Sequence, residues 1–99
     1  MPEVLPASII IPTYKRAAYL SECLKAVAAL KTDPATFELI IVDNNSPDNT
    51  QDISSKFAQA HPELQVRYLC EVAQGCSPAR NRGVAEARGE ILCFLDEDS

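Results

Sequence analysis

The hydrophobic residues of this 99-residue chain follow two alternating kinds of pattern. Continuous apolar runs rich in β-branched residues are typical of strands buried in a parallel sheet. Between these runs, apolar residues such as Leu20, Leu24 and Val27 recur at steps of three and four, which is typical of an amphipathic helix. Four segments are predicted to be strands, the third of them less buried: residues 8–11, 37–42, 65–69 and 90–95.

Three helices are predicted between these strands: residues 17–30, 47–60 and 77–88. Pro47 and Pro78 each follow a serine, which is the pattern of a helix N-cap followed by the first helical residue. Gly89 stands where a helix would end in a left-handed conformation. After a tail of residues 1–7, the alternation of strand and helix predicts one domain over residues 8–99. We expect a Rossmann-like, three-layer α/β/α fold with a mainly parallel sheet.

Polar residues cluster where the predicted strands end. Ligands of open parallel sheets bind beyond the carboxyl ends of the strands, so this edge is the candidate site. The candidates are Pro12, Thr13 and Tyr14 after the first strand, Asp43 and Asn44 after the second, Arg80 after the third, and Asp96 and Asp98 after the fourth. Each also has a plainer interpretation, because turn residues bond their own backbone and an arginine can simply be solvated.

Three consecutive acids, residues 96–98, follow the last apolar run and repel one another. A hard cation would relieve that repulsion, and carboxylates are typical ligands of Mg²⁺ or Mn²⁺. In an extended segment residues two apart point the same way, so Asp96 and Asp98 can face one ligand while Glu97 faces away. The alternative is an acidic strand end that faces water.

The overall charge limits which classes of binding partner are expected. Fourteen acids against nine bases give a formal net charge of -5, and no run of Lys or Arg could neutralise a row of phosphates, so nucleic acid is not expected. The four cysteines form no Cys-x-x-Cys pair, which argues against zinc and for a reducing compartment. No apolar run reaches about 18 residues. We expect a cytoplasmic location, with membrane association left to sequence outside this chain.

Four linked motifs resemble family 2 glycosyltransferases, in order and at matching separations. They are IIPTYKR at residues 10–16, IVDNNSPDNT at 41–50, Gly75 with ARNRG at 79–83, and FLDED at 94–98. The resemblance implies the type A glycosyltransferase fold, in incomplete form. It also implies an inverting, divalent-metal-dependent transfer of sugar from a nucleotide-diphospho-sugar, with uridine as the first candidate nucleoside.

The same resemblance implies roles for the candidate residues. Pro12, Thr13 and Tyr14 would line the base and ribose, and Asp43 or Asn44 would hydrogen-bond the base. Arg80 would approach the base or the diphosphate. Asp96 would lie near the ribose or metal-bound water, and Asp98 would bind Mn²⁺ or Mg²⁺ directly.

One residue departs from the family pattern, since many members have a second aspartate where this chain has Asn44. An amide both donates and accepts hydrogen bonds, which leaves thymidine and guanosine open as alternatives to uridine. In the family the catalytic base and the acceptor site follow the Asp-x-Asp motif. We therefore expect the base to lie beyond Ser99, and residues 1–99 alone not to transfer sugar.

Two other functions fit parts of the pattern. The chain could be a nucleotide-binding module without catalysis, or a phosphatase with an aspartyl nucleophile and Mg²⁺, although the motif of such phosphatases normally follows the first strand.

A sheet that ends at its fourth strand would also leave an unpaired edge. We expect self-association, for example a homodimer, through that edge. The acceptor of the sugar stays open.

Overall fold

A computed structural model describes residues 5–15, 17–30, 33, 36–47 and 49–95 of the chain. The described elements alternate as predicted: β1 (Leu5–Thr13), α1 (Ala17–Ala28), β2 (Phe37–Asp43), α2 (Thr50–Ala60), β3 (Gln65–Cys70), α3 (Cys76–Glu86) and β4 (Gly89–Phe94). The described strands form one parallel sheet in the order β3-β2-β1-β4, which confirms the predicted Rossmann-like architecture. Among the described residues, no helix combines the length and apolar character needed to cross a bilayer.

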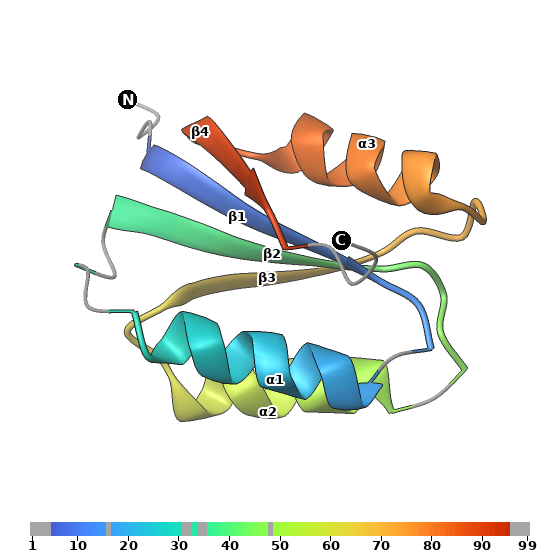
Figure 1. The fold of residues 1–99 in the computed structure, drawn as a ribbon, viewed down its shortest axis with the longest axis horizontal. Helices are drawn as coiled ribbons and strands as arrows, with labels where there is room; N and C mark the ends of the chain where they lie inside the picture. The colour runs from blue at the N-terminus through green and yellow to red at the C-terminus, as the bar shows by residue number, and fades with distance from the viewer. Residues whose placement is uncertain (1–4, 16, 31–32, 34–35, 48, 96–99) are drawn as a thin grey trace.

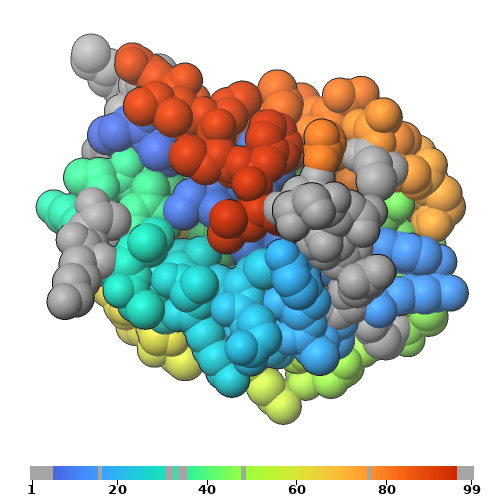
Figure 2. Space-filling model, in the orientation of Figure 1, coloured from blue at the N-terminus to red at the C-terminus, as the bar shows by residue number. Residues whose placement is uncertain are grey.

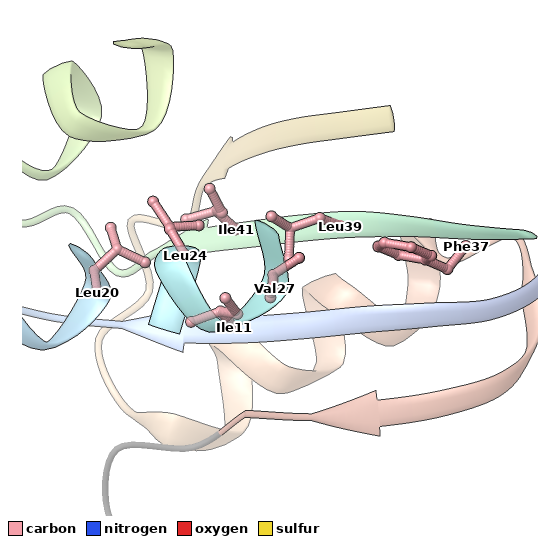
Figure 3. Close-up of a cluster of buried hydrophobic side chains, with 7 residues drawn as sticks. All are labelled: Ile11, Leu20, Leu24, Val27, Phe37, Leu39 and Ile41. Atoms are coloured by element: carbon pink, nitrogen blue, oxygen red, sulfur yellow. The ribbon is translucent and has the colours of Figure 1, made fainter. Parts of the chain in front are cut away.

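The helices cover both faces of the sheet. Figure 1 shows α1 and α2 on one face and α3 on the other. Side chains alternate along β1 and β2, so that Ile11 and Ile41 join the cluster under α1 while Ile10 and Ile40 pack on the side of α3. The cluster under α1 is drawn in Figure 3. Its buried members are Ile11, Leu20, Leu24, Val27, Phe37, Leu39 and Ile41.

Strand β1 is longer than expected at both ends and contains Pro12, the residue predicted to stop it. The carbonyl of Thr13 accepts the N–H of Asn44, on the side of β2. The carbonyl of Ile10 accepts the N–H of Leu95, on the side of β4. Backbone groups alternate along a strand, so the nitrogen of Pro12 faces the side of β4. The last β4 partner of β1 is Phe94, opposite Ile10, so the missing N–H of Pro12 falls where that pairing ends.

Helix α2 begins at Thr50 rather than at Pro47, and Asn49 takes the N-cap position. Ser46 does not cap the helix. Its backbone N–H donates to the carboxylate of Asp43 at 2.8 Å, and its hydroxyl accepts the N–H of Lys15 at 3.0 Å. The serine therefore closes a side-chain turn after β2 and ties that turn to the loop after β1.

The predicted role of Gly89 is wrong. Helix α3 ends at Glu86, and Gly89 is the first residue of β4, without the positive φ expected of a left-handed helix end. A Cβ on Gly89 would lie 2.4 Å from the carbonyl carbon of Ala7 and 2.5 Å from the nitrogen of Ser8. The glycine is needed because β4 approaches the backbone of β1 too closely for a side chain.

Strand β4 was expected to be buried, but its side chains are exposed. Ile91 is 61% exposed, and Leu92, Cys93 and Phe94 are also exposed. The reason is its position at the edge of the sheet, beside β1 alone. In Figure 2 the atoms of β4, in red, lie uncovered on the face turned to the viewer.

Candidate functional site

The ends of β1 and β2 bring two predicted site residues together. Thr13 and Asp43 are register partners in neighbouring parallel strands, so their side chains share a face of the sheet. The N–H of Asn44 donates to the carbonyl of Thr13 at 2.9 Å and continues this pairing by one residue. All three are buried, with exposed fractions of 4% for Thr13, 2% for Asp43 and 5% for Asn44.

The hydroxyl of Thr13 stands out chemically. It is buried, and among the described side chains it is the one buried polar atom without a hydrogen-bond partner. A buried hydroxyl left unpaired costs about 1–3 kcal/mol. The carboxyl edge of the sheet therefore holds an unused donor and acceptor next to a carboxylate, at the position where the sequence predicted ligand contacts.

The carboxylate of Asp43 is held through both oxygens. Its Oδ1 accepts the backbone N–H of Ser46 at 2.8 Å, and its Oδ2 accepts the hydroxyl of Tyr68 at 2.5 Å. Tyr68 lies on β3 and was not predicted as a site residue. The sequence did predict a strand there, but the register that places Tyr68 opposite Ile41 comes only from the structure.

Asn44 is engaged with the loop that leads from β3 to α3. Its amide nitrogen donates to the carbonyls of Glu71 and Ala73, both at 2.8 Å, and its side-chain oxygen accepts the N–H of Gly75 at 2.9 Å. Both amide hydrogens are thus used within the protein, so Asn44 has only acceptor capacity left for a ligand. The structure gives this side chain a role in holding the loop.

The loop after β1 forms the exposed part of this edge. The side chain of Tyr14 is 37% exposed, and the ammonium of Lys15 lies 5.2 Å from the centre of its ring. Lys15 has a φ of 55°, and its N–H bonds to Ser46 across the gap between the two loops. Pro12 is buried inside β1, one residue before Thr13. Figure 1 shows the loops after β1, β2 and β3 at the same end of the sheet.

Arg80 lies further along this edge. Its guanidinium carbon lies 5.6 Å from the centre of the Phe94 ring at the end of β4, a cation–π arrangement that ties α3 to β4. The N–H of Leu95 donates to the carbonyl of Ile10 at 3.0 Å, so the backbone follows β1 up to that residue. The structure thus brings Thr13, Asp43 and Asn44 into contact and puts Arg80 beside β4.

The predicted metal ligands Asp96 and Asp98 lie outside the described residues. Within the described part of the chain, no group of three or more His, Cys, Asp or Glu side chains is arranged to hold a metal ion. The described edge therefore offers neutral hydrogen-bonding groups, one held carboxylate and an exposed aromatic ring. Such a combination suits a polar, planar ligand.

The sequence matches the family model described as Glycosyl transferase family 2 over residues 8–99. The chain belongs to this glycosyltransferase family. It is 37% identical over 99 residues to Glycosyltransferase AglE of Haloferax volcanii, covering 99% of this chain and 32% of that protein. It is 43% identical over 93 residues to a PGL/p-HBAD biosynthesis glycosyltransferase of Mycobacterium bovis, covering 92% and 34%. The chain thus spans about a third of these curated family members.

Solved structures of glycosyltransferases have the same fold. The mannosyltransferase PcManGT from Pyrobaculum calidifontis, in complex with GDP-Man and Mn²⁺, matches with a TM-score of 0.87 and 29% identity, over 93% of this chain and 27% of that one. TarS 1–349 of S. aureus in complex with UDP matches with a TM-score of 0.85 and 29% identity, over 95% and 28%. The predicted type A glycosyltransferase fold is confirmed as a partial domain.

Proposed function

We propose that this chain forms the donor-binding part of an enzyme that transfers sugar from a nucleotide-diphospho-sugar to an acceptor, with inversion. Family membership supports the reaction class, and the related structures in complex with GDP-Man or UDP support a nucleotide donor. The single observation that carries the proposal to this site is the buried, unpartnered hydroxyl of Thr13 beside Asp43. A nucleoside that bonds to Thr13 would remove the cost of that unpaired group.

The roles follow from chemistry and position. The exposed ring of Tyr14 stacks on the base, a contact worth about 1 kcal/mol. Pro12 lines the base and ribose together with Thr13. Asp43 accepts a hydrogen bond from the base. Arg80 approaches the diphosphate, because a guanidinium matches paired phosphate oxygens. Uridine is the first candidate, with guanosine and thymidine next.

For the metal, we propose that Asp98 binds Mn²⁺ or Mg²⁺ directly and that Asp96 lies on the ribose or water side. The PcManGT complex contains Mn²⁺, which supports a divalent ion in this proposal. When bound, such an ion neutralises the charge of the departing diphosphate. The position of the catalytic base beyond Ser99 and the cytoplasmic location stay predictions, and the acceptor stays open.

Calorimetric titration with UDP, GDP and TDP, with and without Mn²⁺, tests the proposal. Thr13→Val keeps the shape of the side chain and removes a hydroxyl that has no partner. We expect this variant to fold with unchanged or higher stability and to bind the nucleotide about tenfold more weakly, which corresponds to one lost hydrogen bond. Asp98→Ala should abolish the metal dependence.

Ser54→Ala is the matched control for that titration. The hydroxyl of Ser54 is buried in α2 and donates to the carbonyl of Thr50 at 2.9 Å, so its loss should lower stability and leave nucleotide affinity unchanged. Wild-type protein that binds none of the three nucleotides would contradict the proposal. Binding without sugar transfer by the full-length protein would favour the nucleotide-binding module instead.

A further inference from the structure

A hydrogen bond links Tyr68 to the proposed donor site. Its ring is half-buried and packs against the apolar cluster under α1, in register with Ile41 on the neighbouring strand. Asp43 lies two residues beyond Ile41 on the same face of β2, and the hydroxyl of Tyr68 donates to its Oδ2 at 2.5 Å. This length is typical of a charge-assisted O–H···O⁻ bond.

The carboxylate of Asp43 is therefore fixed at two points. The N–H of Ser46 holds Oδ1 from the chain that follows β2, and Tyr68 holds Oδ2 from β3. Two donors on opposite oxygens hold the carboxylate plane in one orientation. They leave it able only to accept further hydrogen bonds, because an ionised carboxylate has no donor.

We propose that Tyr68 is a positioning residue that, through Asp43, sets the preference of the donor site for bases that carry a ring N–H. This inference rests on the proposed function, and it concerns Tyr68, which none of the four sequence motifs includes. A fixed acceptor favours uracil, thymine or guanine, each of which presents a ring N–H. It disfavours cytosine and adenine, which present a bare ring nitrogen at the equivalent edge.

The hydrogen bond and the packing of Tyr68 can be separated. Tyr68→Phe keeps the ring against the cluster and removes only the hydroxyl, so Asp43 keeps a single anchor, the N–H of Ser46. A role confined to stability would lower the unfolding midpoint and weaken all nucleotides alike. A positioning role lowers the discrimination between bases, because the carboxylate can then turn away from the orientation that suits an N–H donor.

The experiment measures dissociation constants of UDP and CDP, and of GDP and ADP as a purine pair, in the presence of Mn²⁺. It compares wild type, Tyr68→Phe, Asp43→Asn and the double variant, with Ser54→Ala as the control for loss of one buried hydroxyl bond away from the site. We expect Tyr68→Phe to weaken the preferred nucleotide about tenfold and to reduce the UDP/CDP or GDP/ADP ratio by a similar factor. In the Asp43→Asn background the same change should have no further effect.

The outcomes distinguish the two proposals. If wild type binds UDP or GDP and Tyr68→Phe leaves the base ratio unchanged, or still weakens binding in the Asp43→Asn background, the role given to Tyr68 is wrong while the donor site stands. If wild type binds none of the four nucleotides, the proposed function is wrong and this inference fails with it. A reduced base ratio in Tyr68→Phe alone, with Ser54→Ala like wild type, supports the positioning role.

Discussion

Ser8 and Glu38 form a hydrogen bond of 2.7 Å between two fully buried side chains on neighbouring strands. The hydroxyl of Ser8 donates to Oε2 of Glu38 and also accepts the N–H of Gly89 at 2.8 Å. The same Oε2 accepts the N–H of Arg88 at 2.6 Å, and Arg67 lies 3.3 Å from Oε1. This network joins β1, β2 and β3 to the turn before β4, at the amino ends of the strands, opposite the candidate site.

The first prediction concerns the charge of Glu38. Glu38→Gln replaces one acceptor oxygen with a donor and removes the charge that faces Arg67, which keeps its ion pair with Glu86 at 2.8 Å. We expect a loss of about 1–3 kcal/mol in the free energy of unfolding, measured in urea at pH 7, because the hydrogen bonds of the network to the charged carboxylate are weakened. The control is Glu22→Gln, because Glu22 pairs with Lys25 on the exposed surface and should contribute less than about 1 kcal/mol. Equal effects of the two changes would contradict this account.

The second prediction is a pH dependence of stability that arises from Glu38. Burial raises the pKa of this carboxyl, but hydrogen bonds from Ser8, the N–H of Arg88 and Arg67 outweigh it, so the pKa lies below its ordinary value of 4.5. The unfolded chain therefore binds a proton at higher pH than the folded chain. The contribution of Glu38 is complete above the unfolded pKa and is lost as pH falls through the folded pKa.

Urea unfolding between pH 3 and pH 7 measures this effect. The difference in unfolding free energy between wild type and Glu38→Gln should be constant at neutral pH and should shrink below about pH 4.5. A difference that stays constant across this range would show that Glu38 does not cause the acid sensitivity. Glu22→Gln should follow the wild-type curve.

The fold was predictable from the sequence because the apolar patterns distinguish strands from helices and so give their alternation, although the apolar run of β4 wrongly predicted a buried strand. The edge that carries Thr13 and Asp43 was predictable too, since parallel strands end together. What the pattern could not provide was the register between strands, and with it the contact of Tyr68 with Asp43. Glu38 did carry a signal that was missed: a carboxylate inside a buried apolar run needs partners.

Positions next to proline and glycine were predicted less well, because local propensity competed with tertiary contacts there. Ser46 has the residue type of an N-cap, but its bonds to Asp43 and Lys15 use it in a turn. Gly89 has the residue type of a helix end, but the approach of β4 to β1 requires it. In both cases a contact distant in sequence decided the conformation.

The third prediction concerns Asn44, where the chain departs from the pattern with two aspartates. Asn44→Asp loses both donors and faces the carbonyls of Glu71 and Ala73 with an anion. We expect a loss of about 1–3 kcal/mol in stability, together with weaker nucleotide binding, because the loop before α3 is no longer held. Urea unfolding and calorimetry measure the two effects. Gln59→Glu, the same amide-to-acid change at an exposed position of α2, is the control and should change neither.

The fourth prediction concerns the exposed edge of the sheet. An edge strand with apolar side chains on its surface favours pairing with another copy, so we expect the 99-residue chain to self-associate through β4. Ile91→Lys puts a charge on that edge and should weaken association by about tenfold or more in sedimentation velocity. Leu30→Lys, at an exposed apolar position after α1, is the matched control and should associate like wild type. A wild-type chain that stays monomeric at high concentration, or equal effects of the two substitutions, would exclude β4 as the contact.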